Sequence, residues 1–219
     1  MTEQAPLRAL FGGTFNPVHS GHIRAMDALH QVCGFDRVHF ILSARPPHKS
    51  SVCVSIEHRF AMLQLALSDY QAFCADDTEI QRIEPSYTAD TVAEFQSRFV
   101  DDRLVMIIGA DSLLKLHTWY HIDDWFETVN WIVLSRPGVA LERGHYAAER
   151  VTSHWQEVLG PEGGNLWIWP HSDYDVSSTR IRECLQQGTS LSEQDRVFLN
   201  HAVSAPVLDY IHRHSLYQS

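Results

Sequence analysis

Two histidines stand three positions apart in a glycine-rich segment near the start of the chain, residues 12–22. Gly12 and Gly13 allow the backbone to approach a phosphate closely. The helix that is expected to follow offers free N–H groups and the positive end of its dipole. His19 and His22 can face the same side, where both imidazoles could donate hydrogen bonds to phosphoryl oxygens as charge develops in a transition state. On spacing alone, they could equally be polar residues at a helix start or two ligands of a metal ion.

A second unusual segment lies near the C-terminus, where residues 176–182 read as a helix start with Ser177 or Ser178 as the N-cap. The positive end of a helix dipole disfavours cations, yet this first turn carries Arg180 and Arg182. A bound triphosphate would reverse the sign of that interaction, and the hydroxyl groups of the segment would add donors. The alternative is a solvent-exposed turn with two arginines that bind nothing.

The elements that must position these residues alternate along the chain as apolar runs and amphipathic stretches. We expect strands at 7–11, 38–42, 73–75, 78–83, 104–108, 131–134 and 166–169. We expect helices at 21–33, 57–68, 89–99, 178–187 and 205–213, with a weaker helical pattern at 146–158. Strands separated by helices indicate βαβ units and therefore a three-layer α/β fold with a parallel sheet. With no repeat, low-complexity tract or linker, we expect a single domain over residues 1–219.

The glycine-rich segment follows the first expected strand directly. Ligands of open α/β sheets bind at the carboxyl ends of the strands, so the segment is expected at that edge. It contains no G-x-x-x-x-G-K-[ST] and is therefore not a Walker-type loop. It contains no G-x-G-x-x-G, so a dinucleotide-binding fingerprint is not supported either.

Together, the segments G-G-T-F-N-P-V-H-S-G-H and V-S-S-T-R-I-R resemble the nucleotidylyltransferase superfamily, whose members bear an H-x-G-H loop and a C-terminal S-S-T-x-x-R-like segment. Further segments match the family of bacterial nicotinate mononucleotide adenylyltransferases in the same order: residues 46–49, 85–91, 107–113, 119–120 and 136–138. The resemblance covers nearly the whole chain and is weakest at residues 143–164. It implies a Rossmann-like nucleotidylyltransferase fold with a parallel central sheet and a helical C-terminal part.

The resemblance also implies roles for individual residues. The catalytic residues would be His19, His22 and Arg182, with both histidines at the α-phosphate of ATP. The remainder of ATP and its phosphates would lie against Gly12, Gly13, Thr14, Phe15, His48, Lys49, Gly109, Ser177, Ser178, Thr179 and Arg182. Nicotinate mononucleotide would contact Tyr87, Thr88, Asp111, Trp119, Tyr120 and Arg136. Mg²⁺ is expected with ATP, bound to phosphate oxygens and water more than to protein carboxylates, and no protein metal ligand is expected.

The chemistry of the acceptor residues agrees with these roles. Tyr87 and Trp119 are suited to stack on a pyridine ring, and a cationic ring adds a cation–π contribution. Thr88 is expected at the start of a helix whose free N–H groups could receive the nicotinate carboxylate, which would favour the acid over the amide. Asp111 could bind ribose hydroxyls or serve as a helix N-cap. The alternative for Tyr87, Trp119 and Tyr120 is that they are ordinary aromatic residues of the core or its rim.

We therefore expect ATP and nicotinate mononucleotide to give the deamido dinucleotide and pyrophosphate. The phosphate of the mononucleotide is already anionic, so neither an activating base nor a covalent intermediate is needed. Catalysis would consist of positioning and charge stabilisation. The rival hypotheses are an adenylyltransferase for another phosphate acceptor, such as phosphopantetheine or nicotinamide mononucleotide, and a non-catalytic nucleotide-binding regulator of the same fold.

Composition restricts the other possibilities. The formal net charge of −10 over 219 residues argues against a broad nucleic-acid interface, which needs a basic face. There is no apolar run of the ~18 residues that a membrane span requires, and no signal-peptide pattern, so we expect a cytoplasmic protein without membrane partners. It would act as a monomer or small homo-oligomer. Cys33, Cys53, Cys74 and Cys184 are widely spaced and are expected to be reduced thiols, with neither disulfides nor a zinc site.

Overall fold

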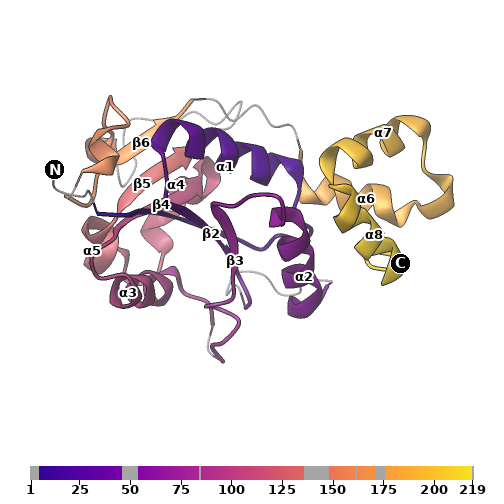
Figure 1. Ribbon diagram of the computed structural model, residues 1–219, viewed down its shortest axis with the longest axis horizontal. Coiled ribbons are helices and arrows are strands. Elements are labelled where there is room, and N and C mark those ends of the chain that lie inside the picture. Colours follow the sequence, from indigo (N-terminus) through magenta and orange to yellow (C-terminus); the bar gives the residue numbers. More distant parts are fainter. Residues whose placement is uncertain are drawn as a thin grey trace.

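The computed structural model describes residues 5–45, 54–83, 85–135, 148–160, 162–170 and 176–218. Its centre is a six-stranded sheet in the order β3-β2-β1-β4-β5-β6 (Figure 1). The strands are β1 (Leu7–Gly13), β2 (Arg37–Leu42), β3 (Phe73–Asp76), β4 (Arg103–Gly109), β5 (Asn130–Leu134) and β6 (Leu166–Trp169). Every neighbouring pair is parallel. The expected three-layer α/β fold with a parallel central sheet is confirmed.

The helices form two layers and a C-terminal group. One face of the sheet is covered by α1 (Ser20–Cys33) and α2 (Ile56–Leu67). The other face is covered by α3 (Thr88–Arg98), α4 (Ala110–Leu114) and α5 (Ile122–Trp125). The C-terminal group consists of α6 (Ser178–Gln186), α7 (Glu193–Ala202) and α8 (Ala205–Arg213). Single 3-10 turns occur at Leu116–Thr118, Phe126–Thr128, Ala148–Arg150, Glu157–Leu159 and Gly188–Ser190.

Alternation along the central strands explains the two hydrophobic layers. Side chains of a strand point to opposite faces in turn. In β4, Val105 and Ile107 pack with the α1–α2 layer, whereas Leu104 and Met106 pack with the α3–α5 layer. A strand that is buried on both faces requires apolar residues throughout, as β4 has.

The order of the strands fixes where a ligand can bind. The chain builds β1, β2 and β3 toward one edge and then crosses back to add β4, β5 and β6 on the other side of β1. Such a reversal opens a crevice at the carboxyl ends of the two strands that flank it. The register pairs Phe11 with Ile107, so β1 and β4 end side by side at Gly13 and Gly109. The loops after these two strands therefore border the crevice.

Two expected elements are wrong, and three helices were not expected. Residues 78–83 form no strand, because the carboxylate of Asp76 accepts from the Thr78 N–H at 3.0 Å and the N–H of Ile80 donates to the Asp77 carbonyl at 2.8 Å, which together make a turn. The helix expected at 146–158 is absent from its described part, residues 148–158, where the helical content is a 3-10 turn at Ala148–Arg150 and the start of another at Glu157–Leu159. Helices α4 and α5 were not expected, since they are only 5 and 4 residues long. Helix α7 was not expected either, since most of its side chains are exposed and polar.

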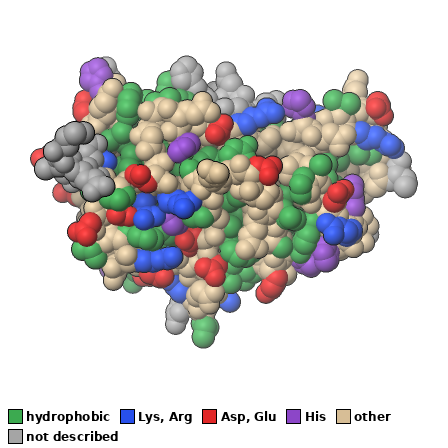
Figure 2. Space-filling view, viewed as in Figure 1, with side chains coloured by type: hydrophobic (Ala, Val, Ile, Leu, Met, Phe, Trp, Pro, Cys, Tyr) green, Lys and Arg blue, Asp and Glu red, His purple; other side chains and the backbone are tan. Residues whose placement is uncertain are grey.

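The C-terminal helices pack at one end of the molecule beside α1 and α2, and the two termini lie at opposite ends (Figure 1). On the face in Figure 2, Lys and Arg side chains are interspersed with Asp and Glu side chains over both parts.

Across the described ranges, no helix is both long and apolar enough to cross a membrane. Cys33, Cys74 and Cys184 are free thiols, and Cys53 lies outside the described residues. A single domain over residues 1–219 stays a prediction.

Candidate active site

The loop after β1 is folded over the ring of Phe15. This ring is buried and lies edge-on to the imidazole of His22, with 5.1 Å between centroids. A Cβ atom at Gly13 would lie only 2.7 Å from the ring, so no other residue fits at this position without displacing Phe15. A Cβ atom at Gly12 would meet no protein atom within 4 Å. The packing of Phe15 therefore requires a glycine at position 13, whereas no packing requires one at position 12, where the backbone is exposed to the crevice.

His19 and His22 lie together at the start of α1, as the spacing predicted. Their rings are stacked, with 3.6 Å between centroids and 25° between planes. His19 is the N-cap residue, and its backbone N–H donates to Nδ1 of His22 at 3.3 Å. A neutral imidazole that accepts at Nδ1 carries its proton on Nε2. His22 is thus held in the tautomer whose Nε2–H can donate to a phosphoryl oxygen.

The C-terminal segment reaches the same loop. Ser177 is the N-cap of α6, and its side chain accepts from the Arg180 N–H at 3.3 Å. The hydroxyl of Ser178 donates to the carbonyl oxygen of Pro17 at 3.0 Å. One guanidinium nitrogen of Arg182 donates to the carbonyl of Asn16 at 2.7 Å. The structure therefore brings Ser178 and Arg182 to the histidine loop across more than 160 positions of sequence.

The two arginines of α6 differ in their surroundings. The guanidinium of Arg180 lies over the ring of Phe198, 3.9 Å from its centroid. Arg182 also donates to the hydroxyl of Thr179 at 3.3 Å and is only half-buried. The first turn of α6 contains no acidic residue that would neutralise these cations. Of the two arginines, Arg182 is the one placed beside the loop.

A buried arginine that the sequence reading passed over organises this side of the crevice. Arg59 of α2 is 1% exposed. Its guanidinium donates to the carbonyl oxygens of Thr14 at 2.9 Å, Ser43 at 2.9 Å and Ala44 at 3.3 Å. It thereby joins the loop after β1 to the loop after β2. The signal in the sequence was its position four residues before Leu63, on the apolar face of the helix.

The residues assigned to the acceptor gather at the start of α3. Helix α3 begins at Thr88, one residue earlier than expected, and Tyr87 is its N-cap. Tyr87 stacks on Tyr120 with 4.6 Å between ring centroids and 27° between planes. Trp119 does not join this pair. It stacks on Trp125 with 6.2 Å between ring centroids and is half-buried.

Gly109 and Asp111 lie at the end of β4. Gly109 is the N-cap of α4, and Asp111 stands in the first helical turn with its side chain exposed. The alternative that Asp111 is itself the N-cap is therefore wrong. His48, Lys49 and Arg136 lie outside the described residues.

The buried carboxyl group of Glu79 links α3 to the loop after β2, through hydrogen bonds from Thr91 and from the backbone of Ala44. Oε1 of Glu79 accepts from the hydroxyl of Thr91 at 3.1 Å. Ser86, next to Tyr87, makes two hydrogen bonds with the backbone of Arg45. The Ser86 N–H donates to the Arg45 carbonyl at 3.2 Å, and the Arg45 N–H donates to the Ser86 hydroxyl at 3.1 Å. Burial raises the pKa of the Glu79 carboxyl, against hydrogen bonds from Ser86 and Thr91 that lower it. Sequence reasoning missed Glu79, because nothing local marks it as buried.

The donor set around the histidine loop suits phosphate oxygens. It consists of imidazole, hydroxyl, guanidinium and backbone N–H groups, all of which can donate hydrogen bonds. Among the residues that the structure describes, no three His, Cys, Asp or Glu side chains are grouped as a metal site.

The cytidylyltransferase-like family model matches residues 10–184, which places this chain among the nucleotidyltransferases. A protein of Idiomarina loihiensis named "Probable nicotinate-nucleotide adenylyltransferase" is 34% identical over 216 residues, 96% of this chain and 99% of its own. A protein of the same name from Escherichia coli O17:K52:H18 is 35% identical over 97% of this chain and 99% of its own. The chain therefore belongs to the nicotinate-nucleotide adenylyltransferases of the cytidylyltransferase-like family.

A solved structure supports the fold independently. Nicotinic acid mononucleotide adenylyltransferase of Plasmodium falciparum, in complex with NaAD, superposes with a TM-score of 0.74 over 97% of each chain. The two sequences are only 15% identical, so this likeness concerns the fold alone.

Proposed function

We propose that this protein transfers the adenylyl group of ATP to the phosphate of nicotinate mononucleotide, giving nicotinate adenine dinucleotide and pyrophosphate in NAD biosynthesis. The observation that carries the proposal is the stacked pair His19 and His22 at the start of α1, with Arg182 beside the same loop. The names of the relatives at 34% and 35% identity support the choice of substrates.

In the proposed reaction, an oxygen of the mononucleotide phosphate forms a bond to the α-phosphorus of ATP. The bond from that phosphorus to the α,β-bridging oxygen breaks, and pyrophosphate leaves with the electron pair. No proton has to be removed, because the attacking phosphate is already anionic. The protein's contribution is to align the two phosphates and to stabilise the charge that develops between them.

The described residues suit this task. The Nε2–H of His22 would donate to an oxygen of the α-phosphate, with the ring held by the His19 backbone. Arg182, Ser178 and the backbone at Gly12 would hold the β- and γ-phosphates, with Thr14, Phe15, Ser177, Thr179 and Gly109 around them. Mg²⁺ belongs to the substrate in this proposal, since it would arrive on the triphosphate oxygens.

The acceptor would bind at the start of α3. The free N–H groups of the first turn, at Thr88 and Ala89, would receive the nicotinate carboxylate, and a neutral amide would lose this interaction with the helix terminus. The stacked rings of Tyr87 and Tyr120 would contact the pyridine, together with Trp119. Asp111 is exposed at the end of β4, where its carboxylate could accept from ribose hydroxyls.

We place the reaction in the cytoplasm, on free nucleotides. The net charge of −10 supports small substrates over nucleic acid. The protein would act as a monomer or small homo-oligomer.

The test is an acceptor panel with ATP and magnesium ions, in which pyrophosphate release is followed with nicotinate mononucleotide, nicotinamide mononucleotide or phosphopantetheine. We expect the highest kcat/KM with the nicotinate compound. A higher kcat/KM with the amide would contradict the proposed role of the α3 terminus. Turnover with phosphopantetheine alone would mean that phosphopantetheine, and not nicotinate mononucleotide, is the acceptor. ATP binding without pyrophosphate release in the presence of any of the acceptors would favour a non-catalytic regulator.

A further inference from the structure

The last residues of the described chain return to the histidine loop. The hydroxyl of Tyr217 donates a hydrogen bond to Oδ1 of Asn16 at 2.8 Å, across 201 positions of sequence. We propose that Tyr217 is a positioning residue for adenylyl transfer, which holds the loop of Asn16 in the geometry that receives ATP. This inference rests on the proposed function and adds a residue that does not touch substrate.

The C-terminal segment is shaped to make this contact. Ser215 has φ = +49° and Tyr217 has φ = +63°, a left-handed conformation that side-chain-bearing residues rarely adopt. The N–H of Leu216 donates to the carbonyl of Ile211 at 3.0 Å, which folds the segment back onto α8. Backbone strain of this kind persists only where the surrounding contacts hold it. Tyr217 is 8% exposed, so its hydrogen bond is shielded from water.

Asn16 is the residue of the loop where several contacts meet. Its side chain accepts from Tyr217, and its carbonyl accepts from Arg182 at 2.7 Å. The preceding residue, Phe15, lies against His22, and the following residue, Pro17, accepts from Ser178 at 3.0 Å. A shift of Asn16 would therefore move both the guanidinium of Arg182 and the ring that supports His22.

The effect should be confined to one substrate. Asn16 lies in the loop that we assign to ATP, just before α1, whereas the acceptor residues Tyr87 and Thr88 lie at the start of α3, the helix that covers the other face of the sheet. Loss of the Tyr217 hydroxyl should thus weaken the use of ATP and leave the KM for the mononucleotide unchanged. A residue that merely stabilises the fold would affect both substrates alike.

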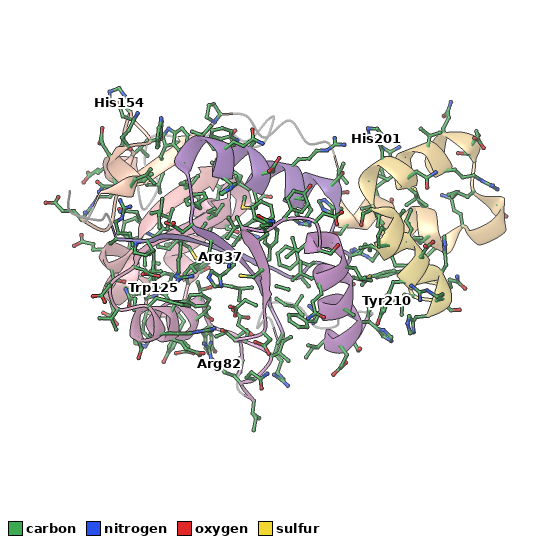
Figure 3. The ribbon with its side chains drawn as sticks, in the orientation of Figure 1. Arg37, Arg82, Trp125, His154, His201 and Tyr210 are labelled. Carbon is green, nitrogen blue, oxygen red and sulfur yellow. The ribbon has the colours of Figure 1, made fainter. Side chains whose placement is uncertain are left out.

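Tyr217→Phe removes one oxygen atom and keeps the ring that packs in the core. The matched control is Tyr210→Phe on α8, which removes the same atom from a tyrosine that faces α2 (Figure 3). Tyr210 is hydrogen-bonded to Nδ1 of His58 at 2.9 Å, far in the sequence from the histidine loop. We expect kcat/KM for ATP to fall about threefold to tenfold in Tyr217→Phe, the value of one hydrogen bond, and to stay near the wild-type value in Tyr210→Phe.

Hydrogen exchange of the substrate-free protein gives a readout that does not depend on the reaction. We expect the backbone N–H groups of Thr14, Phe15, Asn16 and Val18 to exchange faster in Tyr217→Phe than in the wild type or in Tyr210→Phe. Unchanged exchange there would overturn the proposal, as would equal losses of kcat/KM for both substrates. If the wild type forms no pyrophosphate from ATP and nicotinate mononucleotide, the proposed function fails, while faster loop exchange in Tyr217→Phe would still support the positioning of the loop.

Discussion

The guanidinium of Arg59 lies 2.9 Å from the carbonyl oxygen of Thr14, which joins a helix of one layer to the loop that carries both histidines. The same group holds the carbonyls of Ser43 and Ala44. Hydrogen bonds from a charged donor inside the protein are stronger than neutral ones, and loss of the donor leaves buried carbonyls without that partner. Arg59 therefore sets the distance between the loops after β1 and β2.

Replacement of this arginine should be costly. We expect Arg59→Met to lower the free energy of unfolding by ~2–4 kcal/mol, because buried carbonyl oxygens lose a charged donor. Arg37→Met is the control, since Arg37 is exposed and also donates to a backbone carbonyl, that of Gln71 (Figure 3). Urea denaturation compares the two variants, and equal small losses in both would contradict the role given to Arg59.

The two glycines at the end of β1 should respond differently to alanine. Gly13→Ala places a methyl group against the ring of Phe15 and should destabilise the protein by ~1–3 kcal/mol. Gly12→Ala meets open space and should keep wild-type stability within ~0.5 kcal/mol. If a phosphate approaches the backbone at Gly12, the same methyl group should weaken ATP binding by about tenfold. Thermal unfolding and ATP titration calorimetry separate the two effects, and normal ATP binding by Gly12→Ala would place the phosphates elsewhere.

The pH dependence of the free energy of unfolding should reveal the buried carboxyl group of Glu79. Burial raises the pKa of Glu79 in the folded state, so the folded protein binds more protons than the unfolded chain. The stabilisation that Glu79 contributes is fully present below its pKa in the unfolded chain and is lost as pH rises through its pKa in the folded protein. We expect Glu79→Gln to abolish this loss, so that the variant gains stability relative to the wild type as pH rises above the ordinary pKa of a glutamate carboxyl.

The pKa of Asp76 is shifted in the opposite direction, so its effect on the pH dependence of stability has the opposite sign and serves as an internal check. Burial raises the pKa of Asp76, but hydrogen bonds from His39 and Thr78 outweigh it and hold the pKa below its usual range. Its stabilisation is present above the unfolded pKa and is lost as pH falls through the folded pKa. Asp76 is unchanged in Glu79→Gln, so the difference between the two proteins isolates Glu79. A variant whose stability runs parallel to the wild type at every pH would contradict the account.

The sequence predicted what depends on local pattern. The alternation of strands and helices predicted the parallel sheet, and the spacing of His19 and His22 predicted that they face the same side. The approach of Ser178 and Arg182 to the histidine loop could be expected only from resemblance, because it depends on how the C-terminal helices pack. The Tyr87–Tyr120 stack was not expected at all, because tertiary packing places Trp119 against Trp125 and not beside Tyr87.

Other features left no local trace. Glu79 reads as a surface acid, and its burial follows from the turn at Asp77 that replaced the expected strand. The contact of Tyr217 with Asn16 depends on the left-handed backbone of Ser215 and Tyr217. Glycine is the residue type that predicts a left-handed conformation, and neither position is a glycine. Helix α7 escaped notice because its apolar side is narrow, with Leu199 and Ala202 as its buried residues.

In the proposed function, the histidine pair stabilises adenylyl transfer from ATP to a pyridine mononucleotide. The most direct measurement is turnover and ATP affinity of His22→Ala with nicotinate mononucleotide, compared with the wild type and with His30→Ala at the other end of α1. We predict one dinucleotide per pyrophosphate in the wild type, and a loss of about 100-fold in kcat for His22→Ala with ATP affinity retained within about threefold. His30→Ala should keep the wild-type kcat. Wild-type kcat in His22→Ala would contradict the account.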